Sequence, residues 1–114
     1  MTIWNESLPG ELWLVGISGR LDHEQTPLLE TELTRLLEED HHFLIIDLSE
    51  VTYINSGGLR CLVTIWRQAR QQEGDVVLCG LSERIEQLFK VVGFEKVFKI
   101  FDTCSAAQEA LLAG

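Results

Sequence analysis

Basic side chains are scarce in this chain. Its 114 residues include nine lysines and arginines against eighteen aspartates and glutamates, giving a formal net charge of −9 and a pI near 4.6. A field of this sign repels phosphate backbones and anionic bilayers, so we expect neither nucleic acid nor a membrane surface as the primary partner. A protein or a small ligand is the expected partner.

Long hydrophobic runs are also missing. No apolar stretch approaches the roughly 20 residues that a membrane-spanning helix needs, and the start, MTIWNESLPGELW, lacks a basic segment followed by an apolar one. We therefore expect a cytoplasmic protein. With two prolines, 46% hydrophobic and 24% charged residues, the composition is typical of a folded chain. Its length predicts one domain over residues 1–114.

Cysteines are few and irregularly spaced. Cys61, Cys79 and Cys104 are odd in number and form no CxxC motif, which argues against a disulfide framework and against a zinc site. We expect three reduced thiols, with Cys79 in the core and Cys61 exposed.

The sequence motifs of several enzyme classes are absent too. There is no P-loop lysine motif, no GxGxxG and no GxSxG, and the three histidines have no recognisable order relative to a serine. His41 and His42, beside Glu39 and Asp40, are typical of a solvated connection after a helix rather than of metal ligands. We expect no enzyme, no cofactor and no metal.

Apolar periodicity divides the chain into alternating strands and helices. It predicts strands at 2–6, 11–17, 43–48, 76–80 and 97–101 and helices at 24–39, 59–73, 82–93 and from 103 onward. The first two strands form a hairpin across residues 8–10, and each later strand follows a helix. This order predicts an α/β fold, with a mixed, mostly parallel sheet of four or five strands flanked by about four helices.

Helical spacing also predicts the buried faces. In helix 24–39 the predicted core residues are Leu28, Leu29, Leu33, Leu36 and Leu37, and Glu24, Glu30 and Glu32 are biased toward its start. In helix 59–73 the predicted core stripe is Leu59, Val63 and Trp66, which leaves Ile65 on the flank and Arg60, Cys61, Thr64, Arg67 and Gln68 toward solvent. Ser82 is the predicted N-cap of the third helix, Gly93 its end, and Thr103 the cap of the last helix.

The segment Asn55-Ser56-Gly57-Gly58 lies between a predicted strand and a predicted helix. Asn55 is a good N-cap residue, and the helix start presents free N–H groups that stabilise negative charge, such as a phosphate on Ser56. The two glycines cost helix propensity, yet they allow another backbone to approach the serine. Locally, this pattern fits a plain capped turn as well as a functional serine.

A second loop, Gly19-Arg20-Leu21-Asp22-His23, also follows a strand and precedes a helix. The carboxyl ends of parallel strands meet at one edge of a sheet, so this loop is expected near Ser56. Asp22 is either the cap of the first helix or part of a contact surface around Ser56.

Three separated segments, taken together, resemble a known family. GRLDHEQTPLLETEL, LIIDLSEVTYINSGGLRCLV and VVLCGLSERIEQLFKVVGFEKVFKIF are similar in order and spacing to the STAS domain of anti-sigma factor antagonists, the bacterial anti-anti-sigma proteins. The resemblance spans residues 11 to about 112.

The resemblance implies a partner-switching regulator. In that family, the unphosphorylated domain binds an anti-sigma factor that is also a serine kinase, and this displaces the sigma factor. The kinase then phosphorylates a serine at the start of the second helix, and a serine phosphatase resets the switch. By motif, that serine is Ser56. The implied partner-binding residues are Gly19, Arg20, Asp22, His23, Asn55, Ser56, Gly57, Gly58, Leu59 and Arg60.

Two positions depart from the family pattern. The family usually has aspartate before the phosphorylated serine and Ser or Thr after it, where this chain has Asn55 and Gly57. Ser56 is therefore the only hydroxyl in the motif. The alternative is a STAS module that docks on a transporter or binds a nucleotide, with Ser56 unphosphorylated. The expected oligomeric state is a monomer or a weak dimer.

Overall fold

The alternation of strands and helices is confirmed in the computed structural model, which describes residues 2–113. The elements are β1 (Thr2–Leu8), β2 (Leu12–Leu21), α1 (Thr26–Glu38), β3 (Phe43–Ile54), α2 (Ser56–Gln71), β4 (Asp75–Cys79), α3 (Glu83–Val92), a 3-10 turn (Phe94–Lys96), β5 (Ile100–Phe101) and α4 (Cys104–Ala113).

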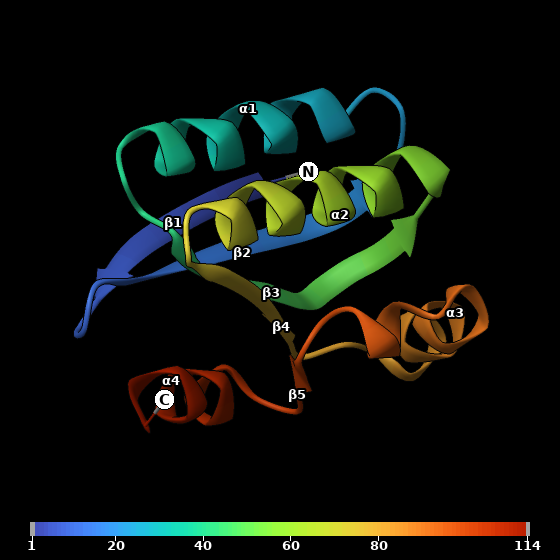
Figure 1. The fold of residues 1–114 in the computed structure, drawn as a ribbon. Helices are drawn as coiled ribbons and strands as arrows, with labels where there is room; N and C mark the ends of the chain where they lie inside the picture. The colour runs from blue at the N-terminus through green and yellow to red at the C-terminus, as the bar shows by residue number, and fades with distance from the viewer. Residues whose placement is uncertain (1, 114) are drawn as a thin grey trace.

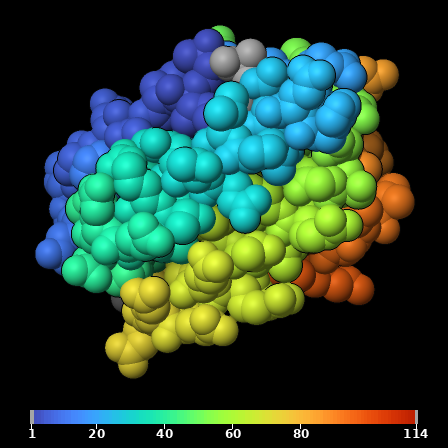
Figure 2. Space-filling model, turned by 90° about the horizontal axis from the view of Figure 1, so that it is seen from above, coloured from blue at the N-terminus to red at the C-terminus, as the bar shows by residue number. Residues whose placement is uncertain are grey.

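The strands form one mixed sheet in the order β1-β2-β3-β4-β5. The β1–β2 pair is antiparallel and the other pairs are parallel, as the sequence predicts. Helices α1 and α2 lie side by side over one face of the sheet, and α4 lies on the opposite face (Figure 1). Viewed from above, α1 and α2 together cover most of that face (Figure 2).

Strand β3 carries apolar side chains on both faces of the sheet, so helices must pack on both faces. Leu44, Ile46 and Leu48 belong to the main core cluster, whereas Ile45 belongs to a smaller cluster that includes Ala107 of α4. All four side chains are fully buried. A strand buried on both faces has a continuous apolar run, which is why FLIIDL shows no alternation.

Three strand predictions are wrong by three residues or more. The second strand, predicted at 11–17, continues to Leu21, because residues 18–21 also pair with β3. β3 continues six residues beyond 48, because its second half pairs with residues 18–21 of β2 and still buries Val51 and Ile54. The last strand is only Ile100–Phe101 rather than 97–101, because Val97 and Phe98 continue the turn that begins at Phe94, whose carbonyl accepts from both of their N–H groups. Local patterning detects neither a half-strand with apolar residues at irregular spacing nor a turn that continues into an apolar run.

Helix α1 differs from its prediction at the start. It begins at Thr26, so Glu24 lies in the preceding turn, and the first turn holds no acidic residue. Leu28 is 58% exposed and not part of the core, whereas the other four predicted leucines are buried. The buried stripe is therefore narrower than the apolar pattern suggests.

The predicted core stripe of α2 is rotated relative to the observed one. The buried residues are Gly58, Cys61, Leu62, Ile65 and Ala69. Leu59, Val63 and Trp66 are half-buried on the flank, where the Trp66 ring meets Phe98 edge-on at 6.0 Å between centroids. Phe98, which follows α3 in the chain, thus packs on the side of α2 that the pattern assigned to the core. Of the predicted outer-face residues, Arg60 and Arg67 are exposed, whereas Thr64 and Gln68 are half-buried.

The cysteine predictions are wrong in two respects. Cys61 is buried at 4% exposure rather than exposed, because it lies on the true core stripe of α2. Cys79 and Cys104 form a disulfide, although all three thiols were expected to be reduced. Cys79 ends β4 and Cys104 begins α4, and the chain between them returns to bring their Cα atoms within 5.4 Å. A separation of 25 residues creates no local motif.

The capping predictions for α3 and α4 are confirmed. Ser82 Oγ accepts from the Ile85 N–H at 3.3 Å, Gly93 ends α3 with a left-handed φ of 79°, and Thr103 Oγ1 accepts from the Ala106 N–H at 3.0 Å. Within residues 2–113, no helix combines the length and the apolar character needed to cross a membrane.

Candidate functional site

The start of α2 presents Ser56 to solvent. Asn55 is the N-cap, and its Oδ1 accepts from the Gly58 N–H at 3.0 Å while its carbonyl accepts from the Leu59 N–H at 3.0 Å. Ser56 is the first helical residue and is exposed. The N–H groups of Ser56 and Gly57 belong to the first turn, where an α-helix supplies no internal acceptor. The hydroxyl therefore lies at the positive end of a 16-residue helix.

The two glycines after Ser56 have different surroundings. A Cβ on Gly58 would lie 3.3 Å from both the Cβ and the carbonyl oxygen of Leu21, so glycine permits a close approach of α2 to the end of β2. A Cβ on Gly57 would meet only Asn55 Oδ1, at 3.4 Å. Gly58 thus has a packing role, whereas Gly57 leaves space beside Ser56.

Residues 19–23 lie beside this helix start, as predicted, but only Asp22 and His23 belong to a loop, because Gly19, Arg20 and Leu21 are the last residues of β2. Leu21 pairs with Ile54 across the parallel strands, and the Asn55 N–H donates to the Leu21 carbonyl at 3.1 Å. Gly19 is half-buried with φ 95° at an irregularity of the β2–β3 pairing. The end of β2 and the start of α2 therefore lie at one edge of the sheet, joined by this hydrogen bond.

Asp22 builds the turn that leads into α1. Its Oδ1 accepts from the N–H groups of Glu24 and Gln25, both at 3.1 Å, and its carbonyl accepts from the Thr26 N–H at 2.9 Å. The N-cap position itself is Gln25, which makes no side-chain cap. Asp22 is half-buried and has a structural role, while its neighbours Arg20 and His23 are exposed.

Two exposed arginines, Arg20 and Arg60, belong to the segments that meet at the helix start. The Arg20 guanidinium lies 4.1 Å from the centroid of the Tyr53 ring, and Tyr53 is 38% exposed. Arg60 is exposed one turn after Ser56, whereas Leu59 is half-buried. Since the first turn of α2 holds no acidic residue, this edge is locally favourable to an anion in a strongly acidic protein.

Sequence reasoning missed Tyr53 and the groove next to it. Residues 52–54 of β3 and Arg84, Ile85 and Leu88 of α3 line a groove that adjoins Asn55. A prediction of the third strand up to Ile54 would have placed Tyr53 in the sheet, where it pairs with Arg20. The approach of α3 is a tertiary feature and has no signal in the local pattern.

The histidine pair lies away from this edge, between α1 and β3. The His41 ring packs on Trp13 with centroids 4.5 Å apart, and its Nε2 is 3.9 Å from Glu39 Oε1. His42 Nε2 lies 3.6 Å from Asp40 Oδ1.

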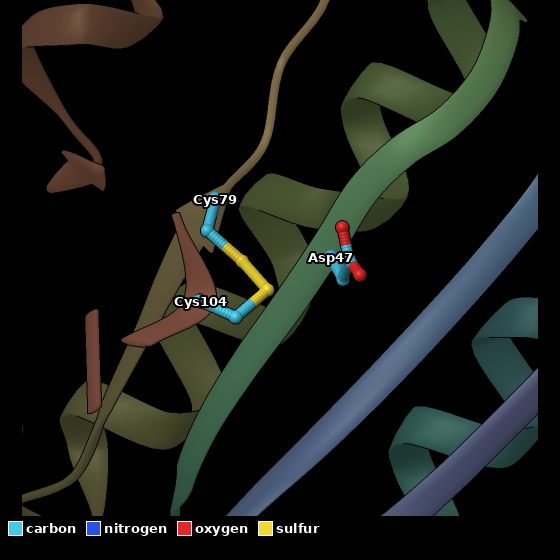
Figure 3. Close-up of side chains that lie close together, drawn as sticks. All are labelled: Asp47, Cys79 and Cys104. Carbon is cyan, nitrogen blue, oxygen red and sulfur yellow. A yellow bond between two sulfur atoms is a disulfide. The ribbon is translucent and has the colours of Figure 1, made fainter. Parts of the chain in front are cut away.

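A different cluster, absent from the sequence predictions, brings together the carboxylate of Asp47 and the sulfurs of Cys79 and Cys104, all within 4.8 Å of one another. The two sulfurs are bonded to each other (Figure 3).

Comparison with known proteins gives one family. The STAS domain model matches residues 8–107. BtrV of Bordetella bronchiseptica, which carries the name of an anti-sigma factor antagonist, is 32% identical over 97 residues, covering 85% of this chain and 81% of BtrV. The anti-sigma-B factor antagonist of Bacillus subtilis is 34% identical over 86 residues, covering 75% and 78%.

Solved structures share the fold. An anti-sigma factor antagonist from Mycobacterium paratuberculosis superposes with a TM-score of 0.87 at 25% identity, covering 96% of this chain and 92% of that one. The Bacillus protein SpoIIAA in its phosphorylated form gives 0.78 at 15% identity, covering 96% and 99%. The STAS domain of a SulP transporter from Vibrio cholerae gives 0.74 at 20% identity, covering 94% and 85%.

Proposed function

Because this chain belongs to the STAS domain family, we propose that it is an anti-sigma factor antagonist that works by partner switching. In this proposal the unphosphorylated protein binds a serine-kinase anti-sigma factor and so frees the sigma factor. The kinase phosphorylates Ser56, which ends the binding, and a serine phosphatase restores it. The protein itself catalyses nothing. Antagonism is supported by the names of relatives that match more than two thirds of the chain.

The observation that carries the assignment of Ser56 is its exposure at the first position of α2. A kinase must reach the hydroxyl, and Gly57 places no side chain in its way. Asn55 supplies the cap that an aspartate supplies in the family pattern, because its Oδ1 accepts from the Gly58 N–H. The two departures of the motif therefore leave both the helix start and access to the hydroxyl intact.

The geometry also favours a local switch. A phosphoserine carries about −1.5 to −2 charges at pH 7. At a helix N-terminus with Arg60 one turn later, this charge is tolerated by the folded protein. At the centre of a fitted, desolvated interface the same charge weakens binding. We expect phosphorylation to change partner affinity without unfolding α2.

The direct test is phosphorylation by the cognate anti-sigma kinase with ATP. We expect one phosphate, mapped to Ser56 by mass spectrometry, and none on the Ser56→Ala variant. A phosphate on another residue, or no phosphate with a kinase that binds tightly, contradicts the assignment.

A binding experiment can distinguish the effect of a negative charge at Ser56 from the effect of the same charge elsewhere on the surface. We expect Ser56→Ala to keep the affinity for the kinase and Ser56→Asp to lose at least tenfold in calorimetry. The matched control is Ser105→Asp, since Ser105 is an exposed serine in the first turn of α4 on the opposite face of the sheet. Equal losses for the two aspartate variants would argue against a switch at Ser56.

The remaining proposed partner residues are Gly19, Arg20, Asp22, His23, Asn55, Gly57, Gly58, Leu59 and Arg60. Exposure singles out Arg20, His23 and Arg60 as the side chains that a partner can reach, so alanine at these positions should weaken kinase binding. If the chain is instead a nucleotide-binding module, nucleotides should raise its melting temperature in a thermal-shift screen and kinase binding should be absent. A module that docks on a transporter should show neither the nucleotide shift nor kinase binding.

A further inference from the structure

We propose that Cys79 and Cys104 form a reversible thiol–disulfide modification site that fastens α4 to the sheet. The two residues come from the end of β4 and the start of α4, and their sulfurs meet beside Asp47 of β3 (Figure 3). Their Cα atoms are 5.4 Å apart, within the range that a disulfide spans without backbone movement. This site is separate from the Ser56 edge and does not depend on the proposed partner switching.

The two cysteines are not equivalent. Cys104 is half-buried and is the first residue of α4, where the helix N-terminus stabilises a thiolate. The turn is held in place by Thr103, whose Oγ1 accepts from the Ala106 N–H at 3.0 Å. Cys79 is fully buried. Cys104 is therefore the thiol that an external reagent reaches, and Cys79 is the partner that completes the bond.

Asp47 places a negative charge beside both sulfurs. Its Oδ1 accepts from the Ser49 N–H at 2.9 Å, and a carboxylate oxygen lies within 4.8 Å of each sulfur. A neighbouring carboxylate disfavours a thiolate, so it slows the first attack by Cys104. Removing this charge should make the pair oxidise faster.

The chemistry is a two-step exchange with a low-molecular-weight disulfide such as oxidised glutathione. The Cys104 thiolate attacks one sulfur of the reagent, which breaks its S–S bond and releases one glutathione thiolate. The Cys79 thiolate then attacks the Cys104 sulfur of the mixed disulfide and releases the second glutathione. The two cysteine protons end on the two glutathione thiols. The protein loses two electrons and the reagent gains them.

The bond matters because α4 has little else to hold it. Among its described residues only Ala107 is fully buried, and Leu111 is half-buried against the small cluster that includes Leu12, Ile45 and Val77. A covalent link at the first residue of such a helix fixes its start on the sheet. Reduction should therefore loosen α4 first, and amide hydrogen exchange in residues 104–113 should rise at least tenfold relative to the oxidised protein.

The test uses the full chain, reduced and then exposed to oxidised glutathione. Differential alkylation with mass spectrometry should find Cys61 as the free thiol and Cys79 bonded to Cys104. Cys61→Ser should form the same bond. Cys79→Ser should stop at one glutathione adduct on Cys104, and Cys104→Ser should acquire no adduct. Asp47→Asn should oxidise several-fold faster than wild type.

Three results would overturn the proposal. They are three free thiols after oxidation of the wild-type chain, a bond or adduct that involves Cys61, and equal exchange of α4 amides in the two redox states. The wild-type measurements decide the matter even if a cysteine variant fails to fold. Kinase phosphorylation of Ser56 can be measured in both redox states, so each proposal fails or stands without the other.

Discussion

The cap of α2 offers a quantitative test of how this edge of the sheet is built. Asn55→Ala removes the oxygen that accepts from the Gly58 N–H at 3.0 Å. Loss of an N-cap side chain costs about 1 kcal/mol, and the value here should be about 1.5 kcal/mol because Gly58 is buried and water cannot fully replace the acceptor. At roughly 2.1 cal/mol/K per residue, unfolding this chain has an entropy of about 240 cal/mol/K. The melting temperature should fall by about 6 °C.

The assay is thermal unfolding by circular dichroism, with two comparison variants. Asn55→Asp keeps the acceptor and adds a negative charge at the positive end of α2. It should therefore be more stable than wild type, by about 0.3–1 kcal/mol. Ser82→Ala removes the equivalent cap of α3, a longer bond of 3.3 Å to Ile85, and should cost about 1 kcal/mol or less without affecting phosphorylation of Ser56. The Asn55 side chain does not stabilise α2 as described if Asn55→Ala melts within about 1 °C of wild type, or if Asn55→Asp lowers the melting temperature as much as Asn55→Ala does.

Two further predictions concern residues close to this helix start. Gly57→Ala should raise the free energy of unfolding by about 0.5–1 kcal/mol through helix propensity. Gly58→Ala should lower it, because the new Cβ would lie 3.3 Å from the Leu21 carbonyl oxygen. Chemical denaturation measures both values, and the opposite order of stability would contradict this packing. Burial, with a smaller effect of Glu30, raises the pKa of Cys61 from 9.0 to about 12. The unfolded chain ionises first, so stability should fall as the pH rises from 9 to 12, and Cys61→Ala should show a shallower decline in denaturant titrations across that range.

Most of the Ser56 edge could be predicted from local sequence. Asn55 followed by Ser56 and two glycines between a strand and a helical pattern predicts a capped helix start, because the capping bond spans only three residues. The rule that parallel strands end at one edge then brings Arg20 and His23 nearby. The bond from the Asn55 N–H to the Leu21 carbonyl agrees with that expectation.

Other parts of this edge required the tertiary structure. Glycine at position 58 gains its packing reason only when Leu21, 37 residues earlier, lies 3.3 Å from the place of its missing Cβ. Likewise, the stacking of Arg20 on Tyr53 depends on the strand register, which periodicity leaves open because the buried residues in the second half of β3 do not alternate.

The sequence by itself determined the order of strands and helices, the caps, and the position of Ser56 at a helix start, since these follow from contacts between residues a few positions apart. Only the tertiary structure decided which side of α2 faces the core and which cysteines meet. Cys61 turns inward because neighbouring helices and Phe98 set the rotation of α2. Cys79 finds Cys104 because β5 returns the chain beside β4, and that long-range pairing leaves no trace in the spacing of three cysteines.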